Sequence, residues 1–171
     1  SQQGPTLVAP DAIGNQRLGI SVALSSDGNT ALVGGWWDNA QAGAAWVFTR
    51  SGNVWSQQGS KLVGTGAIGN NTFQGNAVSL SSDGNTAIVA GYNDDASKGA
   101  VWVFTRNSGV WTQQGDKLVG TGAVGSGRQG QAVSVSSDGN TLLISAVYDN
   151  GQVGAGWVYS RNGGVLTQLG T

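Results

Sequence analysis

Short runs of apolar and β-branched residues alternate along the chain with clusters of glycine, asparagine, aspartate and serine. This alternation is typical of strands joined by turns rather than of helices. In the first third of the chain it predicts strands over about 19–26, 30–36, 43–50 and 54–63. Between the first two, Ser-Asp-Gly-Asn predicts a tight turn in which Gly28 takes a positive φ and Asp27 bonds its own backbone. We therefore expect an antiparallel hairpin.

The same pattern occurs three times along the chain. The turn sequence Ser-Ser-Asp-Gly-Asn-Thr stands at 25–30, 81–86 and 136–141, with spacings of 56 and 55 residues. A later strand recurs at the same spacings, as Ala44–Arg50, Ala100–Arg106 and Ala155–Arg161. These matches divide a single repeat domain, 1–171, into units of about 1–55, 56–111 and 112–171. Residues 1–4 match the end of a unit, so we expect the chain to begin and end within the same element.

The third strand of each unit carries apolar side chains on both faces. In the first unit Ala44, Trp46 and Phe48 point to one side, and Ala45 and Val47 point to the other. Both faces must therefore be covered. Blades of a β-propeller stack sheet against sheet, whereas a β-trefoil leaves one face polar and outside. The predicted fold is an all-β propeller with three four-stranded antiparallel blades per chain, and a β-trefoil is the alternative.

Tryptophan stands in the middle of this strand in every unit, as Trp46, Trp102 and Trp157. Because a large aromatic residue recurs at one place in each unit, we expect these three to belong to the core. Trp55 and Trp111, with Leu166 at the equivalent place in the third unit, are also expected to pack.

The repeated residues resemble a known family. The matching stretches in the first unit are 19–24, Asp27-Gly28-Asn29, 31–35 and 43–48, and they are similar to the FG-GAP repeat of integrin-α-type β-propellers. The family's Phe-Gly pair reads Leu18-Gly19, Gln74-Gly75 and Gln129-Gly130 here, and its calcium loop is reduced to Ser-Ser-Asp-Gly-Asn-Thr. The resemblance implies a propeller and a noncatalytic scaffold or protein-interaction module, in an extracellular setting. The residues themselves leave the compartment unknown.

The composition excludes several classes of chemistry. The chain has no His, Cys or Met, and its nine acidic residues are all Asp. It can therefore form no thiolate nucleophile, disulfide, Ser-His-Asp triad or histidine-based metal site, and we expect no catalytic residues and no cofactor. Eight Lys and Arg residues are scattered singly at a net charge of −1, which argues against nucleic acid as a partner. No apolar run approaches the ~20 residues that a membrane-spanning helix needs, so we expect no membrane insertion.

A calcium site is not expected at the repeated turns. Calcium takes about six to eight oxygen ligands, several of them carboxylate, and each turn supplies one aspartate. Asp27, Asp83 and Asp138 are therefore expected to shape the turns, with no metal bound. The recurring arginines Arg50, Arg106 and Arg161 are expected to bond local carbonyls or an aspartate.

The loop after the second strand differs most between the units and is the candidate ligand-binding site. Its aromatic, amide and carboxylate residues are Trp36, Trp37, Asp38, Tyr92, Asn93, Asp94, Tyr148 and Asp149. Flat apolar rings beside fixed acceptors suit a carbohydrate or a protein ligand. The alternative is that these aromatic residues only pack between blades. A multivalent carbohydrate-binding lectin is accordingly the second functional class, beside the noncatalytic scaffold.

Three blades leave two open faces, because propellers close as rings of typically four to eight blades. The simplest closed assembly is a homodimer with six blades. We expect the N-terminal segment, 5–8, of one chain to complete the last blade of the other. The alternative is that the chain is a fragment of a longer ring.

Overall fold

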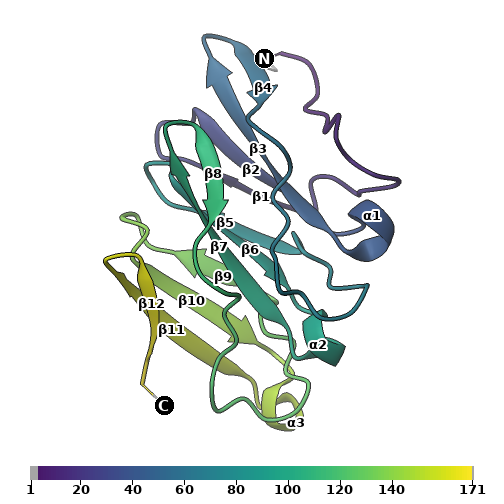
Figure 1. The fold of residues 1–171 in the computed structure, drawn as a ribbon, viewed down its shortest axis with the longest axis vertical. Helices are drawn as coiled ribbons and strands as arrows, with labels where there is room; N and C mark the ends of the chain where they lie inside the picture. Colours follow the sequence, from purple (N-terminus) through teal and green to yellow (C-terminus); the bar gives the residue numbers. More distant parts are fainter. Residues whose placement is uncertain (1–3, 171) are drawn as a thin grey trace.

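The computed structural model describes residues 4–170, and these form three four-stranded antiparallel sheets that lie side by side (Figure 1). The first sheet contains β1 (Ser21–Leu24), β2 (Thr30–Gly35), β3 (Ala44–Ser51) and β4 (Val54–Gln57). The second contains β5 (Ala77–Leu80), β6 (Thr86–Gly91), β7 (Ala100–Asn107) and β8 (Val110–Gln113). The third contains β9 (Val133–Val135), β10 (Thr141–Ala146), β11 (Ala155–Asn162) and β12 (Val165–Leu169). The predicted propeller with three blades is confirmed, and the β-trefoil alternative is wrong.

Each blade pairs its strands in chain order, so the first strand of each lies at one edge of its sheet. These first strands, β1, β5 and β9, are neighbours across the blades. The Ser21 hydroxyl accepts a hydrogen bond from the Val78 amide at 3.0 Å, and Ser79 accepts one from Val135 at 3.1 Å. The first strands therefore form the innermost row of the propeller.

The fourth strand is shorter than predicted. The expected strand over 54–63 ends at Gln57, because Gly59 takes a φ of +72° and turns the chain away. The chain returns at Leu62, which pairs with Ala45 in an isolated antiparallel bridge, and Leu118 pairs with Val101 in the same way. Each connecting segment thus bonds the blade that it leaves before it enters the next.

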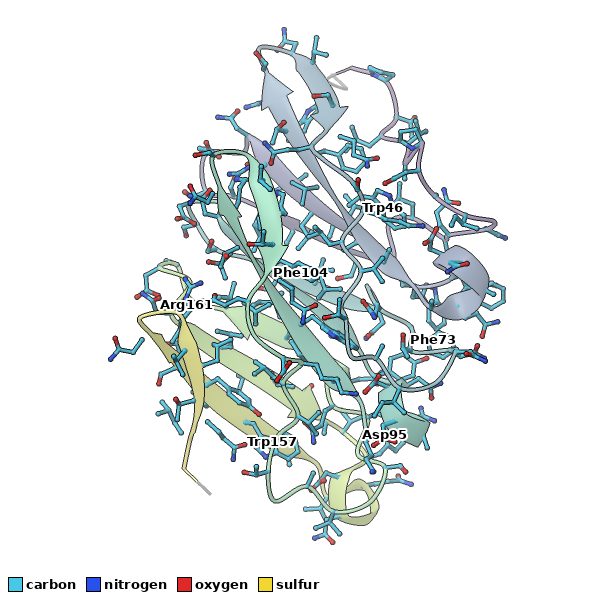
Figure 2. All side chains as sticks on the ribbon, viewed as in Figure 1. Trp46, Phe73, Asp95, Phe104, Trp157 and Arg161 are labelled. Atoms are coloured by element: carbon cyan, nitrogen blue, oxygen red, sulfur yellow. The ribbon has the colours of Figure 1, made fainter. Side chains whose placement is uncertain are left out.

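The core lies between the blades and within them. Leu32 and Val47 of the first blade pack with Val89 and Trp102 of the second. Ile88 and Val103 on the opposite face of the second blade pack in the same way with residues of the third. Trp46, Trp102 and Trp157 are all buried, as predicted, and Figure 2 shows Trp46 and Trp157 on the third strands of their blades. Trp55 and Trp111 are half-buried against the core, in line with the predicted packing role.

The N-terminal segment covers the outer face of the first blade. Leu7, Ala9 and Ala12 pack there with Ala31 and Trp46. The indole Nε1 of Trp46 donates to Asp11 Oδ1 at 2.7 Å, which ties the segment to the blade. Residues 1–3, on which most of the predicted match to a unit end falls, lie outside the described residues.

Arginine side chains join neighbouring blades at the end that carries the tight turns. Arg106 donates to Asn85 Oδ1 within its own blade and to Gln58 Oε1 of the first blade at 3.0 Å. Arg161 reaches Gln114 Oε1 at 3.0 Å and Thr86 Oγ1 at 3.1 Å in the second blade. Their hydrogen bonds go to side-chain amide and hydroxyl oxygens, and Asp83 and Asp27 attract the Arg106 guanidinium through their charge.

The tight turns are held by their aspartates. Asp27 Oδ1 accepts from Ser25 Oγ at 2.5 Å and from the Asn29 amide at 2.9 Å, and Asp83 and Asp138 make the equivalent bonds. The hydrogen bonds from Ser25 and Asn29 favour the ionised carboxylate and lower the pKa of Asp27 from 3.8 to about 2. Ser136 and Asn140 lower the pKa of Asp138 in the same way. At Asp83, burial opposes ionisation, but the bonds from Ser81 and Asn85 outweigh it and the pKa is also lowered.

These lowered pKa values predict acid sensitivity. A carboxylate with a folded pKa below its unfolded value stabilises the fold above the unfolded value, and the contribution disappears as pH falls through the folded value. For Asp27 this window runs from 3.8 down to about 2. We expect the urea midpoint to fall between pH 4 and pH 2, and to fall less in the triple variant D27N, D83N, D138N. An equal fall in both proteins would show that other carboxylates cause the acid sensitivity.

Candidate ligand-binding surface

Three short turns mark the end of the propeller opposite the tight hairpins. They are α1 (Asp38–Gln41), α2 (Asp94–Ser97) and α3 (Asp149–Gln152), and they lie along one side of the molecule (Figure 1). Each contains consecutive residues with left-handed backbone angles, such as Asn39 with φ of 47° and Ala40 with φ of 54°. The loop predicted after the second strand is therefore a compact turn with the same shape in all three blades.

The three aspartates of these turns are buried. Asp38 Oδ1 accepts from the Ile13 amide at 2.6 Å, and Asp94 and Asp149 accept in the same way from Ile68 and Val124. Lys61 and Lys117 form ion pairs with Asp38 and Asp94. These carboxylates hold the connecting segment onto the turn, and Asp149 also lines a hollow of about 260 Å³ with Trp157 and Gln168. That any of them orients a ligand stays a prediction, and the structure gives each of them partners within the chain.

Aromatic side chains of the first two blades meet beside the turns. The Trp36 ring lies 6.2 Å from Trp37, 5.0 Å from Phe73 and 6.4 Å from Tyr92, measured between centroids. Phe73 lies 5.4 Å from Tyr92, so it contacts rings of both blades. Figure 2 shows Phe73 between α1 and α2, on the side of the molecule that carries the three turns. With Tyr148 of the third blade, these residues (Trp36, Trp37, Phe73, Tyr92 and Tyr148) are here named the aromatic strip.

Two arginines stack on the aromatic strip. The guanidinium carbon of Arg17 lies 3.4 Å from the centroid of Trp37 and 5.9 Å from that of Trp36. The guanidinium carbon of Arg128 lies 4.6 Å from Tyr148 and 5.7 Å from Tyr92. Arg17, Phe73 and Arg128 precede the first strands of the three blades, and all have positive φ, at 51°, 57° and 56°. The same position in the repeat is thus an arginine in the first and third blades and a phenylalanine in the second.

A shallow hollow of about 280 Å³ opens beside the innermost strands. Its lining consists of Ile20, Trp36, Asn76, Tyr92 and Gln131. Asn76 Oδ1 accepts from the Tyr92 amide at 3.2 Å, and Asn76 Nδ2 donates to the Gly130 carbonyl at 3.1 Å. The Asn76 side chain is therefore fixed between two blades, whereas the Gln131 residue is exposed.

The predicted site residues divide into two groups. Trp36, Trp37, Tyr92 and Tyr148 contribute rings to the strip, and Tyr148 is 42% exposed. Asn93 instead holds its loop, because its Nδ2 donates to the Asn71 carbonyl and its Oδ1 accepts from Ser97. Arg17, Phe73 and Arg128 were not among the predicted site residues, although their equivalent positions just before the first strands were a signal in the sequence.

Other grooves of the described chain repeat with the blades. One of about 470 Å³ is lined by Leu62, Phe104 and Trp111 among others, and smaller equivalents contain Leu7 with Trp55 and Leu118 with Leu166. Because equivalent grooves occur beside each connecting segment, we interpret them as gaps between stacked blades rather than as ligand sites. Within residues 4–170, no group of three or more acidic residues gathers where a metal ion could be held. The described part also contains no helix with the length and apolarity to cross a bilayer.

The comparisons with known proteins agree with this architecture. The FG-GAP repeat family matches residues 2–48, which confirms the resemblance seen in the sequence. No curated protein matches the chain as a relative. Among solved structures, a protein provisionally described as a 6-phosphogluconolactonase from Bacteroides uniformis matches with a TM-score of 0.60 and 17% identity, over 95% of this chain and 43% of its own. Sqt1 of Saccharomyces cerevisiae matches with a TM-score of 0.59 and 15% identity, over 95% of this chain and 38% of its own.

These structural neighbours establish the fold alone, because their identities are low. Both are propeller proteins, and the chain spans about two fifths of each. The fold and the FG-GAP repeat match over residues 2–48 together define a propeller segment.

Proposed function

We propose that the chain is a noncatalytic binding and scaffold module, and that a second copy completes it to a closed ring of six blades. The observation that carries this proposal is the exposure of side chains whose equivalents are buried between blades. Val22 on β1 is 67% exposed, whereas Val78, at the same place on β5, is 7% exposed because the first blade covers it. Leu24 and Leu80 differ in the same way.

The opposite end of the blade stack shows the complementary exposure. Leu143 on β10 is 49% exposed, whereas its equivalents Leu32 and Ile88 are fully buried against the next blade. Within the chain, residues of the Leu32 type pack against residues of the Val78 and Leu80 type. The third blade of one copy thus offers the surface that the first blade of another copy needs.

Backbone hydrogen bonds between neighbouring blades also support a ring of two copies. The Ser26 amide donates to the Ser82 carbonyl at 2.9 Å, and the Ser82 amide donates to Ser137 at 3.1 Å. In a ring of two copies, Ser137 would donate to Ser26 of the partner subunit. The bridges of Leu62 with Ala45 and of Leu118 with Val101 would likewise be repeated between Leu7 of one copy and the exposed Gly156 of the other. This would place the N-terminal segment across the seam, as the sequence led us to expect.

The absence of catalysis in this proposal rests on the carboxylates. General acid and base chemistry needs carboxyl groups that reach a substrate. At the ligand-binding end Asp38, Asp94 and Asp149 are buried, and the more exposed Asp95 is paired with Lys98. The carboxylates of the tight hairpins bond their own loops. The aromatic strip instead offers contact area, which supports a binding role for a protein or, as the second candidate, for a carbohydrate.

Engineered cysteines test the seam directly, because the chain has no cysteine of its own. The variant S26C, S137C should form a covalent dimer under mild oxidation, seen on a non-reducing gel. The matched control S26C, S82C places cysteines at a junction within the chain and should close without joining two chains. If the control closes and S26C, S137C stays monomeric, the second-copy proposal is wrong. A ladder of longer polymers would show open association instead of a closed ring and would also overturn it.

A further inference from the structure

We propose that the aromatic strip, with Arg17 and Arg128, binds an acidic polysaccharide, whose anionic groups are carboxylate or sulfate. This inference rests on the proposed binding function but not on ring closure. Carboxylated and sulfated polysaccharides are both chains of sugar rings that carry negative charge. The sugar rings would lie against the aromatic residues, and the anionic groups would meet the guanidinium groups.

The charge balance at this end of the propeller favours an anion. The ion pairs found among residues 4–170 are Lys61 with Asp38, Lys117 with Asp94, and Lys98 with Asp95. All three neutralise aspartates of α1 and α2, and Asp149, the aspartate of α3, is buried and accepts from the Val124 amide. Within this described part, Arg17 and Arg128 take part in no ion pair and contact aromatic rings instead. The surface charge left here is therefore positive.

Stacking leaves the guanidinium groups free to recognise anions. An arginine that lies over a ring keeps its N–H donors in the plane of the guanidinium, where they can bind a carboxylate or sulfate in a bidentate manner. The ring beneath restricts the side chain, so less entropy is lost on binding. Trp37 has this role for Arg17, and Tyr148 has it for Arg128.

The shape of the surface favours a polysaccharide over a peptide. Arg17 and Arg128 belong to the first and third units, and the rings of Trp36, Phe73 and Tyr92 lie between them in a series of centroid distances of 5.0 and 5.4 Å. Neighbouring rings are tilted by 60° and 49°, and the hollow beside them measures about 280 Å³ and is shallow, so the rings form an open row rather than one deep pocket. Peptide hot spots usually fill deep pockets, whereas a row of rings with an amide such as Gln131 beside it suits an extended chain of sugars.

Matched polymers test this inference. Polygalacturonate and its methyl ester share the same sugar rings and differ in charge, and dextran sulfate and dextran form a second such pair. We expect calorimetric titration to detect binding of polygalacturonate or dextran sulfate, with weaker binding at higher salt, and none of either neutral polymer. Binding of one anionic polymer alone identifies the source of the charge as carboxylate or sulfate. Polyglutamate, a charged peptide, should bind at least tenfold more weakly than the better glycan.

Single substitutions locate the site. R17Q and R128Q should each weaken binding of that glycan about tenfold, since each removes a charge-assisted hydrogen bond worth about 1.4 kcal/mol. The control K98Q removes one positive charge at the same end, outside the strip, and should change affinity less than twofold. Far-ultraviolet circular dichroism checks that the variants are folded.

Each of the following results would overturn the inference. These are equal binding of charged and neutral polymers, polyglutamate binding as tight as glycan binding, or equal losses in K98Q and the two arginine variants. No binding of any probe by the folded protein overturns it as well. Because titration reads binding and the cysteine experiment reads association, the failure of this inference can be told apart from the failure of the ring.

Discussion

Replacing Trp46 by Ala is expected to lower the free energy of unfolding by about 3–5 kcal/mol, as for other emptied core aromatic sites. The side chain is fully buried, and its Nε1 holds Asp11 of the N-terminal segment. A Cβ at Gly35 would lie 2.7 Å from the indole, so the ring fills its space closely. The substitution therefore removes core contacts and the anchor of the segment together. Urea unfolding followed by circular dichroism measures the loss.

Trp37 is the matched comparison for this substitution. It stands beside α1, is only half-buried, and its equivalents are Asn93 and Tyr148, so the position tolerates polar groups. Trp37→Ala should cost less than about 1 kcal/mol, typical of a surface substitution. If Trp37→Ala unfolds the protein, the ring is a packing residue and the ligand-binding role of the strip loses its support. If Trp46→Ala costs no more than Trp37→Ala, our account of the core is wrong.

Removing residues 1–9 is expected to destabilise the protein and to separate the two copies of the proposed ring. The deletion takes away Leu7 and Ala9, which cover the outer face of the first blade. Loss of the partly buried Leu7 alone costs about 1 kcal/mol, which lowers the melting temperature by about 2–4 °C. It also removes the segment that would bridge Gly156 of the partner subunit. Differential scanning calorimetry and light scattering measure the two effects.

Two neighbouring residues give the control for this deletion. Leu7 packs against the blade, whereas Val8 is largely exposed. Leu7→Ser should reproduce part of the effect, and Val8→Ser should leave melting temperature and mass unchanged. An unaltered melting temperature after the full deletion would mean that the segment is a loose tail.

The sequence predicted the blades well because their pattern is local and occurs three times. The hairpin turn at Asp27, the strand that contains Trp46 and the burial of both its faces all follow from neighbouring residues. Because the pattern occurs in three units, the strands predicted in one unit supported those predicted in the others. The end of the fourth strand was not visible, because Gly59 turns the chain within an otherwise strand-like run.

The candidate site was predicted only in part, because its contacts join segments far apart in the chain. The burial of Asp38 depends on the Ile13 amide and on Lys61, which come from segments before and after its own loop. Arg17 stacks on Trp37 from the start of the same blade. Nothing near Trp37 in sequence indicates that pairing. The aromatic residues that follow the second strands could therefore be found from the sequence, whereas the stacking of the guanidinium groups on them is seen only in the structure.

Because the blades repeat, the exposure of residues at the two ends of the stack can be compared with that of their internal equivalents. Val78 and Leu32 show what a covered position looks like, so the exposure of Val22 and Leu143 can be compared with an internal standard. The two open faces have the same apolar character as the internal ones. The internal blades of the protein thus serve as the reference for its two open faces.

Sedimentation equilibrium of the unmodified chain tests the central claim most directly. The chain mass is 17.3 kDa, and a ring of two copies predicts a single species of about twice that value over a wide range of micromolar concentrations. A species that remains at 17.3 kDa throughout this range would contradict the closed ring.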